Sequence, residues 1–342
     1  VHNYKVFTAL IYTKSLALLQ ILENGLSDRK LLFSFYSLLL LFTFIVASCE
    51  RTFEYDVADV PPFESLEAPA QGEGFQIHVP PFPVPANYER EFYVRMPVGN
   101  KKHIYVNKFE VRCRPGTHHT IAYGYENEND PSHPPIGVIR DQNLPDGNGN
   151  FNLTMGSGTM YCGAQNEDFF SEFPEGVAVR IPANATLDIN SHYFNRTDAT
   201  IFGEVFLNLY TIPLEEVTEL LETDLISNDD QLFLPPNKAT NIEDQKLFGR
   251  PTEIRQMFSH MHKRGYFFRV HKIGGDNHDE LLYEAFDYRH PPYKFFDPPL
   301  KINSGEGLRT VVGYNNETDR EIKYGVTSED EMGILFYYKV NW

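Results

Sequence analysis

From Phe75 onward the chain alternates apolar and polar residues in short runs that Pro and Gly separate. The runs Phe75–Val79, Glu91–Arg95 and Ile104–Val111 show this period of two clearly. A period of two is typical of a strand with one buried face. Many such strands between turn residues predict an all-β protein with a sandwich architecture.

The strand pattern breaks near Pro213, where we place a domain boundary. The segment 214–225 is expected to hold a short helix, and strands resume at Leu232. The two predicted domains, 75–213 and 214–342, are each long enough for a hydrophobic core of their own. The pattern indicates no sequence repeat between them.

The N-terminal segment has the order of features of a secretory signal. Arg29 and Lys30 precede the apolar run Leu31–Val46, and small residues then lead to Cys49. This end resembles a bacterial lipobox, which predicts a signal peptide over 1–48, cleavage before Cys49 and lipidation of its sulfur. The alternative is a membrane anchor, because the apolar run is nearly long enough to span a bilayer.

Residues 49–74 are rich in Pro, Glu and Ala without a clear period, so we expect a linker from the lipid to the fold. The protein would then be exported and lipid-anchored to a bacterial membrane, in the periplasm or at the cell surface. No methionine precedes the signal segment, so we expect the true start near Leu26. In a bacterial protein we treat the Asn-x-Ser/Thr sequons as chance; they begin at Asn152, Asn184, Asn195 and Asn316.

The formal net charge of −17 disfavours binding to nucleic acid through the folded surface. Beyond the lipobox, the remaining cysteines are Cys113 and Cys162. In an exported protein such a pair is expected to form a disulfide. Two separately buried thiols are the alternative.

The histidine pattern is the main chemical signal in the chain. His260 and His262 lie in the run Phe258–Val270, and residues two apart on a strand point to one face, so both imidazoles can bind one metal ion. Such a pair also occurs as two half-buried histidines without a metal.

A second group of histidines comprises His118, His119 and His192. Adjacent residues on a regular strand face opposite sides, so His118 and His119 can share a metal only at a strand end or a bulge. The preceding Pro115-Gly116 supplies an irregular start. The alternative is an ordinary polar turn.

Four motifs occur in one order: Arg-Pro-Gly-Thr-His-His-Thr-Ile-Ala-Tyr-Gly at 114–124, His-Tyr at 192–193, His-x-His at 260–262 and Thr-Ser-Glu-Asp-Glu-Met at 327–332. Together they resemble the copper type II, ascorbate-dependent monooxygenases, which include peptidylglycine α-hydroxylating monooxygenase and dopamine β-monooxygenase. The resemblance extends from about residue 75 to the C-terminus. It implies two tandem jelly-roll β-sandwich domains of eight to nine antiparallel strands, each with one copper site, facing each other across a solvent-filled cleft.

The resemblance also implies two ligand sets. The first ligand set, for the electron-transfer copper, is His118, His119 and His192. The second ligand set, for the catalytic, oxygen-binding copper, is His260, His262 and Met332. A thioether favours Cu(I), which suits a copper that must be reduced before it meets O₂. The alternative for Met332 is core packing.

The sequence departs from the peptide-hydroxylating enzyme where that enzyme has an arginine, an asparagine and a tyrosine near the second ligand set. Here Phe258, Ile334 and Phe336 occupy these places. A buried carboxylate without a charge partner costs several kcal/mol, so a glycine-extended peptide is a poor substrate candidate.

These observations predict a monomeric monooxygenase with two coppers per chain, which hydroxylates a C–H bond of a small substrate with O₂ and a reductant such as ascorbate. The first alternative is a copper-binding exported lipoprotein without catalytic activity. The second is a structural β-sandwich surface protein without copper.

Overall fold

The computed structural model describes residues 56–340 apart from 126–127, 131, 143–158 and 326. The described residues belong to one compact unit. The predicted signal peptide, Cys49, the first part of the linker and the sequon at Asn152 lie outside the described residues. Below, the N-terminal half means described residues 56–213, and the C-terminal half means 214–340.

Apart from two short 3₁₀ turns, the regular elements among the described residues are all strands, so the predicted all-β class is confirmed. The N-terminal half contains η1 (Val57–Asp59), β1 (Gly74–Val84), β2 (Glu89–Pro97), β3 (Ile104–Cys113), β4 (Thr117–Gly124), β5 (Ile139–Asp141), β6 (Met160–Ala164), β7 (Asp168–Glu172), β8 (Val177–Ile181), β9 (Thr186–Phe194) and β10 (Ile201–Ile212).

The C-terminal half contains η2 (Leu214–Glu216), β11 (Glu219–Ser227), β12 (Phe233–Leu234), β13 (Lys238–Leu247), β14 (Thr252–Met261), β15 (Gly265–Ile273), β16 (Leu281–Ala285), β17 (Lys294–Ile302), β18 (Gly307–Asn316), β19 (Ile322–Lys323) and β20 (Gly333–Val340). The helix expected in 214–225 is thus a single 3₁₀ turn, and β11 follows it at once.

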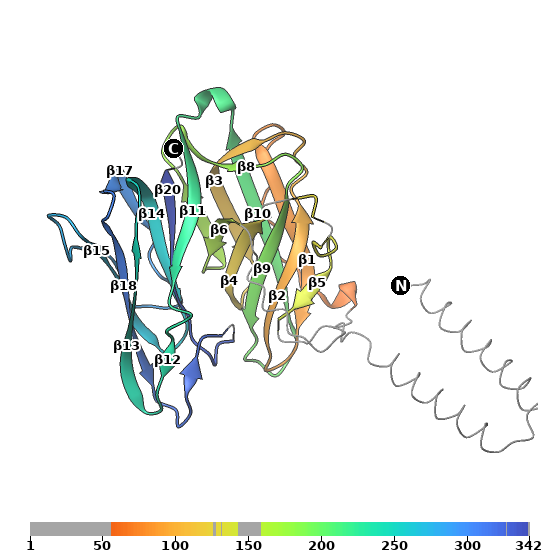
Figure 1. Cartoon of the computed structure of the whole chain (residues 1–342). Coiled ribbons are helices and arrows are strands. Elements are labelled where there is room, and N and C mark those ends of the chain that lie inside the picture. The colour runs from red at the N-terminus through yellow and green to blue at the C-terminus, as the bar shows by residue number, and fades with distance from the viewer. Residues whose placement is uncertain (1–55, 126–127, 131, 143–158, 326, 341–342) are drawn as a thin grey trace, which may run out of the picture. The chain divides into compact units, whose positions relative to one another are not determined.

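One sheet is shared by the two halves (Figure 1). Its nine strands run in the order β1-β10-β3-β8-β11-β20-β14-β17, with β7 paired to β3. The halves join at the parallel pairing of β8 with β11, whereas the other pairs of this sheet are antiparallel. The sheet β5-β2-β9-β4-β6 belongs to the N-terminal half, and β13-β18-β15-β16 belongs to the C-terminal half.

Two hydrophobic cores fill the space between these sheets. The first core includes Phe92 and Ile189 of the five-stranded sheet and Phe109 of the nine-stranded sheet. The second core includes Phe268 and Val312 of the four-stranded sheet, packed with residues of β14 and β20. The first core also takes in residues of the C-terminal half, such as Phe258 and Phe336, and the proposed boundary near Pro213 stays a prediction.

Strand β14 is buried on both faces, which decides where its histidines point. Phe258 belongs to the first core, whereas Met257 and Met261 belong to the second. Because side chains alternate along a strand, His260 shares its face with Phe258 and points toward the N-terminal half. The strand thus brings a predicted metal ligand of the C-terminal half to the N-terminal half.

Asn195 and Asn316 head matching Asn-x-Thr turns, one in each half. In each turn the buried Asn amide donates to three backbone carbonyls, and its oxygen accepts from the N–H and hydroxyl of the Thr two residues on. These two sequons therefore have a structural reason. The shared Asn-x-Thr-Asp at 195–198 and 316–319 is a short repeat that the hydrophobic pattern did not indicate.

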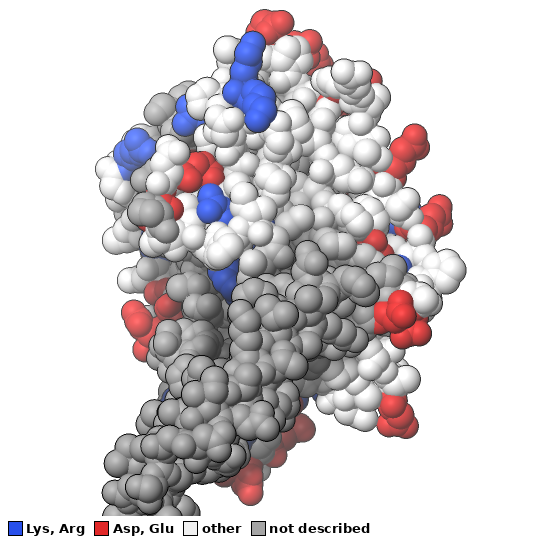
Figure 2. All heavy atoms as spheres, turned by 90° about the vertical axis from the view of Figure 1, so that its right-hand side faces the viewer, with Lys and Arg blue, Asp and Glu red and all other residues white. Residues whose placement is uncertain are grey.

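Figure 2 shows acidic and basic side chains scattered among uncharged residues on one face, whose described part carries no continuous basic patch. Within the range that the structure describes, no helix has the length and hydropathy needed to cross a bilayer.

Candidate metal centre

A β-bulge turns His118 and His119 toward one site. Strands β4 and β9 pair Thr117 with Tyr193 and His119 with His192, so two residues of β4 face a single step of β9. A bulge of this kind re-aims the extra side chain. The irregularity that the sequence required for a shared site is therefore present.

The three histidines of the first ligand set form one buried group. His119 and His192 are direct cross-strand neighbours with ring centroids 5.0 Å apart, and each lies 5.3 Å from His118. One potential ligand atom from each residue lies within 4.8 Å of the others. The described residues thus contain a three-histidine group that could hold a metal ion.

The second ligand set forms where β14 ends and β20 begins. His260 pairs with Ile334 and Met261 with Gly333, which brings Met332 beside His262. The rings of His260 and His262 are 5.1 Å apart, and these histidines and Met332 line the same cavity. The structure therefore brings together the three residues that the resemblance selects, although Met332 also packs in the first core.

The two ligand sets meet at one place. The His260 ring lies 5.3 Å from His119 and 5.8 Å from His118. The cavity between the sets has a volume of about 20 Å³ and is lined by residues of both halves. It has room for a water molecule or an ion. The solvent-filled cleft that the resemblance implies is thus replaced by a closed arrangement with the imidazoles in contact.

Hydrogen bonds fix the orientation of the first set. Nε2 of His119 donates to Oδ1 of Asn190 at 2.7 Å, and Nε2 of His192 donates to Oε1 of Glu89 at 2.7 Å. The Nδ1 atoms of both rings are buried and have no hydrogen-bond partner among the described residues. Each ring therefore presents a bare nitrogen, as metal-binding histidines do when a partner holds the other nitrogen.

The second set is oriented in the opposite sense. Nδ1 of His260 donates to Oε1 of Gln165 at 3.1 Å, and Nδ1 of His262 donates to the carbonyl of Asp330 at 3.3 Å. These contacts leave Nε2 of each ring for a metal. Gln165 belongs to the N-terminal half and also donates to the carbonyl of Ser259, so the first half positions a histidine of the second.

Glu331, next to Met332 in the chain, is fully buried and holds the backbone after His262. Its two oxygens accept the backbone N–H groups of His262 at 3.1 Å and Arg264 at 2.7 Å. Burial raises the pKa of Glu331 to about 7 against the opposing effect of these bonds. Sequence reasoning missed this residue, although its place directly before Met332 was the available signal.

The protonation states suit metal binding. The five imidazoles are each at most 5% exposed. Burial, followed by the neighbouring histidines, lowers the pKa of His118 and His260 well below the usual value, and burial lowers that of His262 to about 4. These rings are neutral at pH 7, which is the form that coordinates a metal.

A buried carboxylate completes the cavity wall. Oε1 of Glu91 accepts from Nδ2 of Asn190 at 3.0 Å, whereas Oε2 is buried without a partner among the described residues. Burial opposes ionisation, but His192, His119 and Asn190 outweigh it and lower the pKa of Glu91. A buried carboxylate with one oxygen lacking a partner is costly, so Glu91 favours a cation in this cavity.

The donor set fits a transition metal. Imidazole nitrogens suit zinc, copper, iron and nickel, and a thioether in the same cavity shifts the preference toward Cu(I). A metal ion would give the buried ring nitrogens the partner that they lack and would balance the charge of Glu91.

The residues that replace the peptide-binding positions form apolar surface. Ile334 and Phe336 line the cavity, and Phe258 stacks on Phe336 with centroids 5.2 Å apart. Among the described residues that line the cavity, none is Arg or Lys. The site therefore offers a substrate carboxylate no cationic partner.

The predicted disulfide is not found and is corrected. Cys113 and Cys162 are buried free thiols, and Sγ of Cys113 lies 3.4 Å from Oγ1 of Thr120. Cys113 lies on β3 of the nine-stranded sheet and Cys162 on β6 of the five-stranded sheet. Packed sheets are about 10 Å apart, whereas a disulfide requires Cα atoms within about 7 Å.

We expect both thiols to resist modification in the folded protein at pH 8. Burial raises the pKa of Cys113 to about 11 and of Cys162 to about 12, so neither is a thiolate. A Cys49→Ser chain titrated with a thiol reagent should show no fast reaction when native and two thiols after unfolding without reductant. If Cys113 and Cys162 formed a disulfide, no thiol would react in either state.

Comparisons with known proteins give no family. No protein-family profile matches the sequence, and no curated protein is similar to it. Among solved structures, the chain is similar to the crystal structure of the STIV MCP, with a TM-score of 0.35, 9% identity and coverage of 79% of this chain and 97% of that one. It is also similar to the major capsid protein P2 from bacteriophage PM2, with a TM-score of 0.30, 10% identity and coverage of 74% and 98%.

Proposed function

We propose that this protein is a copper-dependent monooxygenase, exported and lipid-anchored, that hydroxylates a C–H bond of a small substrate with O₂ and an external reductant such as ascorbate. The observation that carries the proposal is the close approach of five buried histidines, three of which (His119, His260 and His262) line one cavity together with Met332. In the reaction, one oxygen atom enters the C–H bond and the other leaves as water. The reductant supplies two electrons and two protons.

Copper, when bound, would supply one-electron redox chemistry and the activation of O₂. The chain's own residues hold and orient it. The first ligand set offers three imidazoles, which accept both oxidation states, and the second adds the thioether of Met332, which favours the reduced ion. Zinc gains little from a thioether, so the donor set supports copper.

The substrate class follows from the cavity walls. Ile334, Phe336 and the rings of Tyr93 and Tyr123 give it an apolar surface, and Glu91 gives it a negative charge. A substrate carboxylate would be repelled by Glu91 and left without a partner. We therefore propose a substrate whose reacting part is apolar and carries no carboxylate.

The burial of the site favours one second candidate, a copper-binding lipoprotein without catalytic activity. A cavity of about 20 Å³ between buried histidines retains an ion well but admits no substrate until the site opens. Oxygen uptake by the copper-loaded chain with ascorbate tests the choice. Ascorbate oxidation that requires His260 supports the monooxygenase, whereas bound copper without oxygen uptake supports the second candidate.

Metal analysis should find two coppers per chain, one for each ligand set. His118→Ala should lower this to one, because the second set keeps its three ligands. His103→Ala, outside both sets, is the matched control and should keep two. If His118→Ala releases both ions, the neighbouring histidines form a single cluster and the assignment to two sets is wrong.

A further inference from the structure

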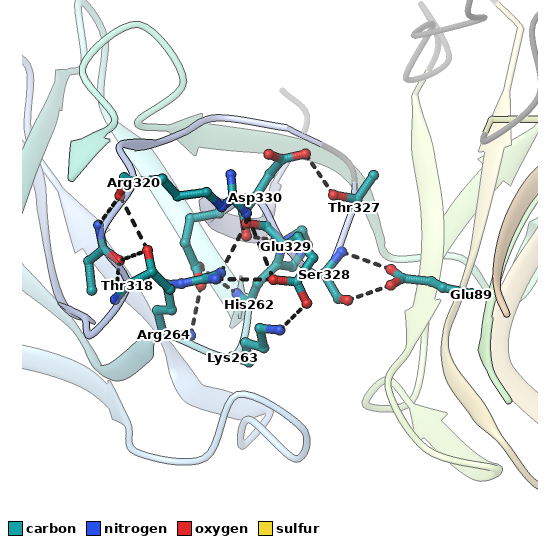
Figure 3. Close-up of polar contacts among 12 residues, drawn as sticks. Glu89, His262, Lys263, Arg264, Thr318, Arg320, Thr327, Ser328, Glu329 and Asp330 are labelled. Atoms are coloured by element: carbon teal, nitrogen blue, oxygen red, sulfur yellow. Dashed lines mark hydrogen bonds and ion pairs between the residues drawn. The ribbon is translucent and has the colours of Figure 1, made fainter. Parts of the chain in front are cut away.

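Glu89 contacts residues of both halves of the chain beside the metal centre. It belongs to neither ligand set. It lies on β2 in the N-terminal half. Oε1 accepts from Nε2 of His192 at 2.7 Å and from the backbone N–H of Ser328 at 2.8 Å. Oε2 accepts the hydroxyl hydrogen of Ser328. Figure 3 shows the Glu89 side chain pointing at Ser328 from the opposite half.

Hydrogen bonds hold the segment that carries Ser328 and leads into the second ligand set. Oγ1 of Thr327 donates to Oδ2 of Asp330 at 2.7 Å, and Nη2 of Arg320 donates to the carbonyl of Glu329 at 2.7 Å (Figure 3). Arg264 donates to the same carbonyl at 3.0 Å. The segment 327–331 is thus braced along its length, and it leads directly into Met332.

The carboxylate group of Glu89 accepts hydrogen bonds from residues of both halves, His192 in the N-terminal half and Ser328 in the C-terminal half. A change in the position of Ser328 is therefore passed to the His192 ring through one side chain.

We infer that Glu89 is a positioning residue that couples the two ligand sets, so that the geometry of the Met332 segment controls how the first ligand set binds metal. The inference rests on the proposed metal function and adds its regulation. The same carboxylate contacts both His192 and Ser328, so a shift of Ser328 changes the contact that orients the His192 ring. Separation of the halves would release both at once.

The test asks whether a residue of the C-terminal half changes metal binding by histidines of the N-terminal half. The test uses a variant with the substitutions His260→Ala and His262→Ala, in which only the first ligand set is left to bind Cu(II). Ser328→Ala, which touches no imidazole, should lower the Cu(II) affinity roughly 10-fold and shift the Cu(II) electron paramagnetic resonance spectrum, as expected for loss of an outer ligand contact.

Two further variants separate coupling from general stability. Glu89→Gln should weaken Cu(II) binding by on the order of 10- to 100-fold, and adding Ser328→Ala to it should cost nothing more, because both act through one contact. Glu204→Gln removes another buried carboxylate of the same half, which pairs with Arg114 at 2.8 Å. It should lower the melting temperature but leave affinity and spectrum unchanged.

The possible outcomes are distinct. The coupling would be overturned, and the metal site left intact, if Ser328→Ala had the same affinity and spectrum as the His260→Ala, His262→Ala variant. Additive effects of Glu89→Gln and Ser328→Ala on the affinity would also overturn it. If neither the unsubstituted chain nor the His260→Ala, His262→Ala variant bound Cu(II), the proposed function and the coupling would both be overturned.

Discussion

Met332→His should leave copper bound to the chain and lower reductant-dependent oxygen uptake by roughly 100-fold or more, since loss of a mere outer contact already costs up to that factor. Met332 lines the cavity with His260 and His262. An added imidazole keeps three ligands but removes the soft donor, which makes the reduced ion less favourable. Copper analysis and oxygen uptake with ascorbate, on the same samples, measure the two effects.

Met261→Leu is the matched control for this change. Met261 lies on the same strand as His260, but its side chain packs in the second core. A swap of similar volume there should cost less than about 1.5 kcal/mol and leave oxygen uptake unchanged. Oxygen uptake at the parent rate in Met332→His would mean that Met332 serves as packing in the first core and that the reacting site lies elsewhere.

The sequence predicted the strands and the local geometry of the histidines well, because both follow from periods of two along the chain. The strands expected around Phe75, Glu91 and Ile104 are β1, β2 and β3. The need for a bulge at His118 and His119 followed from the opposite faces of adjacent residues, and the register between β4 and β9 confirms it.

What the sequence could not give are the contacts between segments far apart in the chain. The distance between the two ligand sets depends on how β14 and β20 pack on the N-terminal half, and no local period encodes that packing. Glu89 lies 103 residues from His192 and 239 from Ser328, so its role has no sequence signal. The disulfide failed for the same reason, because composition does not tell on which sheet a cysteine lies.

Asn190→Leu should weaken metal binding by the first ligand set and also destabilise the metal-free protein. Asn190 is buried, its Oδ1 accepts from His119 at 2.7 Å, and its Nδ2 donates to Glu91 at 3.0 Å. Leucine has a similar volume but offers neither bond. His119 would lose the partner that leaves Nδ1 bare, which predicts a roughly 10- to 100-fold loss of Cu(II) affinity.

The stability effect of Asn190→Leu arises from Glu91. Its Oε2 already lacks a partner among the described residues, and the substitution would take the amide donor from Oε1 as well. Removal of one partner of a buried charge costs about 3–5 kcal/mol, which urea unfolding of the metal-free chain would measure. Bound metal should recover part of this loss, because a cation beside Glu91 compensates the charge.

Asn208→Leu separates this effect from the loss of any buried amide. Asn208 is buried on β10 and donates to the carbonyl of Glu67 at 2.8 Å, away from the cavity lining. Its substitution should cost about 1–3 kcal/mol in the free energy of unfolding and leave Cu(II) affinity at the parent value. Equal losses of affinity in both variants would show that Asn190 acts through stability alone. Parent-like affinity in Asn190→Leu would show that His119 needs no partner at Nε2 to bind metal.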